Sequence, residues 1–140
     1  MLKILISQPM NGLTLEQIKK NREKCISIID KHLSKDEYYI LDNIRENEIN
    51  IAKNMENPRV YMLGNSIALL GNANLVIFLE GWNDAKGCII EDFVCEQYDI
   101  KCIKSLLYLN IYLSKYKKRL NKSNKNSKPR RDKHGRQITI

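Results

Sequence analysis

The sequence lacks any long uninterrupted hydrophobic run. Its longest apolar stretch, residues 67–79, is broken by the polar segment 71–74. A transmembrane helix needs about 20 consecutive apolar residues, and a secretory signal needs an apolar core near the N-terminus. Because we find neither pattern, we expect a cytoplasmic protein that makes no membrane contact.

Paired-cysteine motifs are also missing, although the chain has four cysteines: Cys25, Cys88, Cys95 and Cys102. No two of them have the Cys-x-x-Cys spacing that is typical of zinc sites and redox centres. Three lie on apolar-patterned segments, where a free cysteine packs as a small hydrophobic residue. The sequence therefore predicts no disulfide framework, no metal site and no cofactor, which agrees with a reducing compartment.

Acidic and aromatic residues are scarce near the C-terminus. Residues 115–136 contain eleven Lys or Arg and a single acid, Asp132, whereas the rest of the chain has a net charge of about −2. So polar a segment buries too little apolar surface to offset the entropy of ordering it, and residues 120–140 are expected to form a disordered tail. The tail is either simply solvated or makes weak, non-specific contact with a polyanion. No aromatic residue lies between Leu120 and Ile140, which argues against stacking on single-stranded bases.

Short apolar runs alternate with segments of helical periodicity through the rest of the chain. Strands are expected at residues 2–7, 38–42, 75–80 and 100–103. Helices are expected at residues 14–33, 58–71 and 87–98, with a further short one near 49–54 and an ambiguous one over 104–119. This alternation predicts an α/β fold, a flavodoxin- or Rossmann-like doubly wound parallel sheet in a single domain. That domain would span residues 1–104, followed by a helical extension over 105–119 and the basic tail.

Two polar, glycine-containing loops follow the first and third expected strands. One begins at Ser7 and ends at Gly12, and the other begins at Gly81 and leads into a helix that carries Glu91. In a parallel sheet such loops lie at the carboxyl ends of the strands, where ligands bind. Glu91 is expected in the first turn of its helix, where the helix dipole would help to keep a carboxylate ionised. The same helix has an apolar face made by Ile89, Ile90, Phe93 and Val94.

The two loops and the segment between them resemble the nucleoside 2-deoxyribosyltransferase-like superfamily, in particular a short branch found in Gram-positive bacteria and their phages. The resemblance covers residues 2–104 and rests on three ordered motifs: Ile6–Gly12; Asn57-Pro58 with Tyr61, Ser66 and Ile67; and Gly81-Trp82 with Ala85, Gly87-Cys88 and Glu91. It implies a flavodoxin-like fold, a homo-oligomer, and cleavage or transfer of the N-glycosidic bond of a nucleoside or nucleotide.

The resemblance also implies roles for individual residues. Glu91 corresponds to the nucleophilic glutamate, whose carboxylate would trap the oxocarbenium-like sugar carbon. The implied ligand-binding residues are Ser7, Gln8, Met10, Asn11, Gly12, Asn65, Ser66, Gly81, Trp82, Asn83, Gly87 and Cys88. For several of them a purely structural role stays open, namely turn formation for Ser7 and Asn11, an interface aromatic for Trp82, and packing for Cys88.

Two departures from the family pattern leave a second function open. Characterised transferases carry an aspartate where this chain has Asn65, and an acid or serine where it has Ala85. Asparagine is not a general acid or base at neutral pH. The sequence is therefore compatible with an N-glycosidase or transferase, and also with a non-catalytic protein that sequesters or senses a nucleotide-derived signal, as in phage anti-defence. A third hypothesis places the activity in the basic tail.

Overall fold

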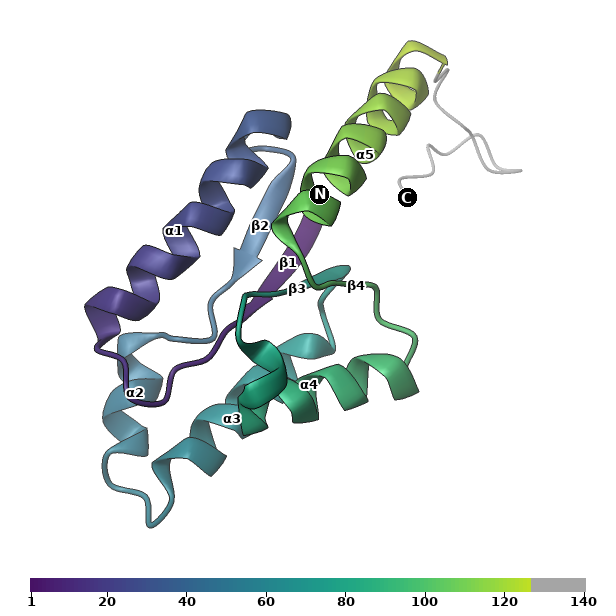
Figure 1. Cartoon of the computed structure of the whole chain (residues 1–140). Helices are drawn as coiled ribbons and strands as arrows, with labels where there is room; N and C mark the ends of the chain where they lie inside the picture. The colour runs from purple at the N-terminus through teal and green to yellow at the C-terminus, as the bar shows by residue number, and fades with distance from the viewer. Residues whose placement is uncertain (127–140) are drawn as a thin grey trace, which may run out of the picture.

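Four parallel strands form the centre of the molecule in the computed structural model, which describes residues 1–126 (Figure 1). They are β1 (Leu2–Ser7), β2 (Tyr38–Leu41), β3 (Leu75–Phe78) and β4 (Cys102–Ile103). Their order in the sheet is β2-β1-β3-β4. In the central strand, Leu5 lies opposite Leu41 on one side and Val76 on the other. The four predicted strands are confirmed, although the last three are shorter than expected.

Helices cover both faces of this sheet, which confirms the doubly wound architecture. On one face lie α1 (Leu15–His32) and α5 (Leu106–Asn126), which pack against each other. The opposite face is covered by α3 (Pro58–Leu70) and α4 (Lys86–Gln97). The short α2 (Glu46–Ala52) packs beside α3 (Figure 1). The chain order therefore alternates between strand and helix, as the sequence predicts.

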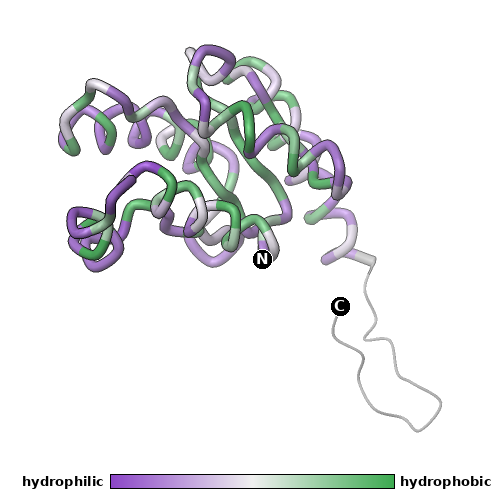
Figure 2. The backbone as a smooth tube through the Cα atoms, turned by 90° about the horizontal axis from the view of Figure 1, so that it is seen from below, coloured by the Kyte–Doolittle hydropathy of each residue, from purple (hydrophilic) through white to green (hydrophobic). Residues whose placement is uncertain are grey.

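Side chains along β1 alternate between two separate hydrophobic cores. Ile4 and Ile6 contribute to the core beneath α1 and α5, while Leu5 contributes to the core beneath α3 and α4. All three side chains are fully buried. Burial on both faces explains why the strands read as continuous apolar runs instead of alternating apolar and polar residues. Figure 2 shows these apolar strands inside and helices of mixed hydropathy around them.

Helix α1 begins with a capping box and carries one charged residue on its buried side. The Thr14 side chain accepts a hydrogen bond from the Gln17 backbone, and the Gln17 side chain accepts one from the Thr14 backbone. Ile18 and Ile29 face the core, and so does Arg22, which is only 6% exposed. Since a guanidinium is costly to bury without partners, its position on the apolar stripe indicates a specific role.

Helix α5 ends later than the sequence predicts. The ambiguous segment 104–119 is a helix, and it continues to Asn126, so the expectation of a tail disordered from residue 120 is wrong for residues 120–126. The helix is anchored by Leu109 and Leu113, which are fully buried, and adding residues to an established helix is far easier than starting one. The remainder of the expected tail, 127–140, lies outside the described residues.

None of the helices within residues 1–126 is long and apolar enough to cross a membrane. The longest, α5, carries lysine and arginine through its second half.

Candidate functional site

The two predicted loops meet at the point where the chain reverses direction across the sheet. From β1 the chain moves outward to β2, then returns to place β3 on the other side of β1. The carboxyl ends of the two strands at such a switch point flank a crevice where α/β proteins bind ligands. Here the loop after β1 and the loop after β3 are in contact, since a Cβ added to Gly81 would lie 3.3 Å from Pro9 Cγ.

Glycines shape both loops through their backbone conformation. Gly12 has φ +79° and completes a turn in which the Leu13 amide donates to the Met10 carbonyl. Gly81 has φ +86° at the start of the short 3₁₀ turn Trp82–Asp84. These are left-handed conformations that other residues rarely adopt. A Cβ at Gly12 would meet nothing within 4 Å, so backbone conformation alone accounts for the glycine there.

Glu91 lies at the base of this region, on the side of α4 that faces the sheet. It is the sixth residue of the helix, because α4 begins at Lys86, so the prediction of a first-turn position is wrong and the correct position is the second turn. The side chain is 6% exposed. Cys88 and Cys95 share the same buried side of the helix.

Burial dominates the ionisation of Glu91. Desolvation raises the pKa of its carboxyl to about 7, because the charged form loses contact with water. The hydroxyls of Ser7 and Ser66 and the more distant charge of Arg22 lower the pKa in part. The expectation that the helix dipole keeps this carboxylate ionised is therefore wrong, since burial outweighs a dipole effect that fades beyond the first turn.

Three buried side-chain atoms within the described part of the chain have no hydrogen-bond partner. They are Ser7 Oγ, Asn65 Nδ2 and Glu91 Oε2. The Ser7 hydroxyl approaches Glu91 and lowers its pKa, yet neither Ser7 Oγ nor Glu91 Oε2 completes a hydrogen bond. Unsatisfied buried polar atoms are rare in folded proteins and are concentrated at functional sites. All three belong to residues that the sequence predicts for the site.

A buried polar network connects the first helix to the same region. Arg22 donates from Nε to Gln8 Oε1 at 2.9 Å, and from Nη2 to the Ile6 carbonyl at 3.1 Å and to Asn43 Oδ1 at 2.8 Å. Asn43 in turn donates from Nδ2 to Ser66 Oγ at 3.1 Å. Ser66 accepts this bond with its oxygen, which leaves its proton for the neighbouring Glu91 carboxylate.

This network includes two residues that sequence reasoning missed, Arg22 and Asn43. Arg22 forms no ion pair with any carboxylate among residues 1–125, and burial lowers the pKa of its guanidinium, with nearby Asp42 opposing that effect most. The sequence did contain a signal, because Arg22 lies four residues after Ile18 and three before Cys25, on the apolar stripe of its helix. Asn43 closely follows the second strand, so a third strand end contributes to the site.

Several predicted ligand residues are already engaged within the protein. Both polar atoms of the Gln8 amide have a protein partner, since Nε2 donates to the Ile18 carbonyl and Oε1 accepts from Arg22. Gln8 therefore ties the first loop to α1. Asn11 accepts a hydrogen bond from Arg59 at the start of α3, which ties the tip of the same loop to the other face of the sheet.

The second loop is held mainly by Trp82. Its ring packs on Phe78 with centroids 5.4 Å apart, and Lys104 Nζ lies 4.6 Å from its centroid. Such a cation–π contact favours a fixed ring position. The remaining predicted residues are a half-buried Met10, an exposed Asn83, Gly87 within α4, and Cys88, whose thiol pKa is raised by burial.

Two hollows of the described surface lie away from Glu91. One, of about 440 Å³, opens between α1 and the end of β2, with Lys19, Arg22 and Asp42 among its lining residues. The other, of about 380 Å³, runs along α5. Glu91 lines neither hollow.

No protein-family model matches the sequence, and neither a curated protein nor a solved structure matches it. The case for a function therefore rests on the chemistry of the site and on the three motifs.

Proposed function

We propose that the switch-point site binds a nucleoside or nucleotide and that Glu91 cleaves its N-glycosidic bond. The observation that carries this proposal is the trio of unpartnered buried atoms on Ser7, Asn65 and Glu91. These three groups suit a sugar, because a carboxylate can attack its anomeric carbon while a hydroxyl and an amide hydrogen-bond its hydroxyls. The motif resemblance to the nucleoside 2-deoxyribosyltransferase-like superfamily supports the same choice of substrate.

The proposed reaction proceeds by double displacement. A Glu91 oxygen attacks C1′ of the sugar and forms a glycosyl ester, while the C1′–N bond breaks and its electron pair leaves with the base nitrogen. The departing base takes a proton from water. In the second step, attack on C1′ by water gives hydrolysis, or attack by the nitrogen of a second base gives transfer, and Glu91 is released as a carboxylate. The proton lost by the attacking water or base neutralises the hydroxide that was left when the departing base took its proton from water.

The lack of an acid that could protonate the leaving base should make the proposed reaction slow. By the motif resemblance, Asn65 occupies the position at which characterised transferases carry an aspartate, and its amide is not a proton donor of suitable pKa. With a pKa of about 7, Glu91 is also only partly ionised at neutral pH, so only part of the protein is in the nucleophilic state. We therefore expect turnover over hours instead of seconds.

Base release measured by chromatography tests the proposal. Purified protein at high concentration is incubated for hours with a panel of ribo- and deoxyribonucleosides and their 5′-phosphates, and the free base is quantified. Wild type should release base from at least one class, and Glu91→Gln should abolish release while changing affinity by less than about tenfold, because the amide keeps the shape but is a poor nucleophile. Glu96→Gln is the matched control, since Glu96 is exposed on the same helix. Equal rates for wild type and Glu91→Gln would exclude Glu91 as the nucleophile.

A non-catalytic nucleotide-binding protein is the second candidate function. Asn65 and the buried, half-protonated Glu91 favour it, because sequestering a nucleotide-derived signal needs polar contacts but no proton transfer. A ligand that raises the melting temperature without any release of base would support this function over catalysis.

We also propose a homo-oligomer in the cytoplasm. The apolar face of α4 predicted from the sequence is turned to solvent for its three largest members, with Ile89 46%, Ile90 41% and Phe93 60% exposed. Exposed apolar side chains gathered on one side of a helix are typical of protein contact surfaces, and this supports the proposal. A second copy of this chain is the occupant that the motif resemblance favours.

A further inference from the structure

The outward side of α5 carries a regular row of lysines. Lys115, Lys118, Lys122 and Lys125 follow one another at spacings of three, four and three residues, so they lie on one side of the helix. All four are exposed. The buried side of the same helix is formed by Leu109 and Leu113, so this lysine row points away from the sheet.

No negative charge on the helix offsets this row. Helix α5 contains no Asp or Glu from Leu106 to Asn126, and none of the four lysines forms an ion pair with another described residue. Lys117 behaves differently. It lies on another side of the helix and contacts both oxygens of Glu37, at 2.6 and 2.8 Å. The protein thus neutralises the lysine that faces its body and leaves the outer row uncompensated.

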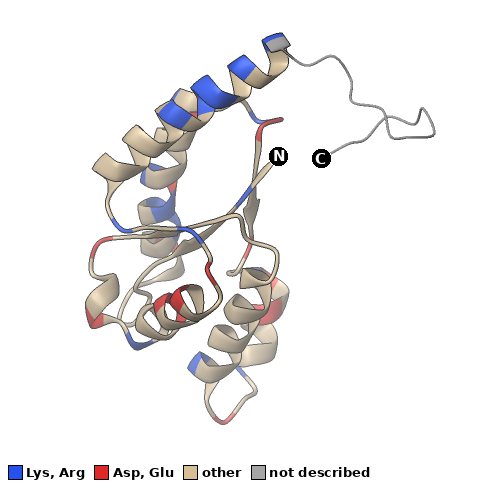
Figure 3. Ribbon diagram, turned by 90° about the vertical axis from the view of Figure 1, so that its right-hand side faces the viewer, with Lys and Arg blue, Asp and Glu red and all other residues tan. Residues whose placement is uncertain are grey.

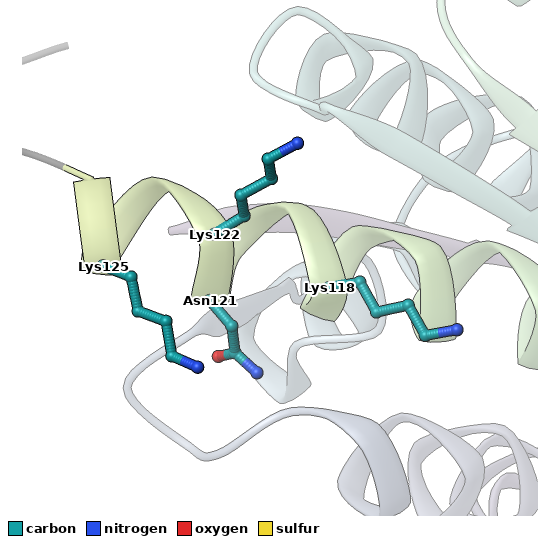
Figure 4. A pocket seen from close by; sticks show the side chains of 4 residues that line it. All are labelled: Lys118, Asn121, Lys122 and Lys125. Carbon is teal, nitrogen blue, oxygen red and sulfur yellow. The ribbon is translucent and has the colours of Figure 1, made fainter.

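The row is also accessible and held in place. Figure 1 shows the second half of α5 extending beyond the sheet, and Figure 3 shows blue lysines and arginines along it. Three of the four lysines, with Asn121, border a shallow hollow of about 380 Å³ on this part of the helix, and Figure 4 shows their side chains reaching outward from it. Because the first half of α5 packs against α1, the lysine row is fixed relative to the domain.

We propose that the lysine row binds the phosphate backbone of double-stranded nucleic acid. Successive lysines are about one helical turn, roughly 5 Å, apart along the axis, which suits contact with successive phosphates. Binding releases condensed counterions, which makes such a row favourable without any base-specific contact. This role goes beyond the proposed nucleotide chemistry and does not depend on Glu91.

Two observations favour a duplex over other polyanionic surfaces. Tyr116 is the one aromatic residue within the span of the row, and it packs against the core beside Leu109 and Leu113, so the row offers no platform for unstacked bases. A helix lying in a bilayer needs an apolar face flanked by lysines. Here the exposed apolar residues Leu107 and Ile111 lie in line with the lysines, further toward the N-terminus of α5, so the lysines occupy the face that would have to insert.

Binding of the full chain to a 20-base-pair DNA duplex, measured by fluorescence anisotropy between 50 and 200 mM salt, tests this proposal. The double variant Lys118→Gln/Lys122→Gln should reduce the slope of log K against log salt by about 2, because each phosphate contact contributes about 0.9. The affinity advantage of wild type over this variant should therefore shrink about tenfold across that salt range. Lys20→Gln/Lys24→Gln is the matched control, since it removes the same charge from exposed positions on α1 and should retain the wild-type slope.

Three outcomes would overturn the proposal. Equal losses in the two double variants would mean that net charge alone attracts DNA. Absence of duplex binding at 50 mM salt would exclude the partner, and stronger binding to anionic lipid vesicles than to DNA would assign the row to a membrane surface. Unchanged melting temperatures of both variants would show that neither substitution acts through the fold.

Discussion

Glu91 is a carboxyl group whose ionisation opposes folding. Burial raises its pKa from 4.5 to about 7, although the Ser7 and Ser66 hydroxyls and the charge of Arg22 partly stabilise the anion. A raised pKa means that the folded protein holds the proton more tightly than the unfolded chain. The resulting stability is complete below about pH 4.5 and is lost as the pH rises through 7. Burying an ionisable carboxyl therefore lowers the free energy of unfolding at neutral pH, but it provides a carboxylate that can react.

We therefore expect Glu91→Gln to remove a pH dependence. The free energy of unfolding of wild type should fall by roughly 2.5 kcal/mol between pH 5 and pH 8, given the shift in pKa. The Gln variant has no proton to lose at this position and should show a much flatter profile. Urea denaturation at several pH values measures both. Parallel profiles for the two proteins would mean that Glu91 titrates normally in the folded state.

Asn43 links Arg22 to Ser66 in the buried network. Asn43→Ala would remove the acceptor of one Arg22 Nη2 hydrogen bond and the donor to Ser66 Oγ. We expect a loss of about 2 kcal/mol in the free energy of unfolding, the usual cost of unsatisfied buried groups. Asn47→Ala, at an exposed position in α2, should cost less than about 0.5 kcal/mol in the same denaturation experiment. Similar losses at the two positions would show that the network adds little to stability.

At the level of elements, apolar patterning was sufficient to predict the strands and most helices. Runs such as Leu75–Phe78 are buried on both faces, and the capping box at Thr14 marks the start of α1 correctly. Composition was a poorer guide to α5, because it describes how a segment behaves alone. The buried Leu109 and Leu113 anchor the first half of the helix, and the basic second half then extends from it.

If α5 is anchored through its buried leucines, Ala substitution at a buried and at an exposed leucine of this helix should differ in its effect on the free energy of unfolding. Leu113→Ala should lower the free energy of unfolding by about 3 kcal/mol, because the side chain is fully buried beneath the helix and its removal leaves a cavity. Leu107→Ala should change it by less than about 0.5 kcal/mol, since Leu107 is 71% exposed. Thermal and chemical denaturation of both variants measure the contrast. An unaffected Leu113→Ala protein would show that α5 does not pack on the domain as described.

For the whole molecule, the alternation of strands and helices along the chain predicted a parallel sheet covered by helices and the meeting of two loops at one edge of it. It did not predict which polar residues would be buried there. Arg22 was missed because a charged residue on an apolar stripe looks like an interruption of the pattern until its partners from β1 and the end of β2 are seen. The first-turn position of Glu91 did not follow even from the expected helix start at residue 87, which makes Glu91 the fifth residue; α4 begins one residue earlier, at Lys86, and Glu91 is the sixth.

The exposed face of α4 allows a prediction about assembly. Phe93 is 60% exposed beside Ile89 and Ile90, and burying such a side chain in an interface contributes about 2 kcal/mol. If a second copy covers this face, Phe93→Glu places a charge inside the contact and should reduce the mass in solution from a multiple of 16.4 kDa to 16.4 kDa. Light scattering after size-exclusion chromatography at several protein concentrations measures that mass. Leu107→Glu introduces the same charge on the exposed surface of α5 and should leave the assembly intact. If wild type is a monomer at every concentration, this face does not bind a second copy of the chain. If both variants dissociate the assembly, the interface includes α5 as well as α4.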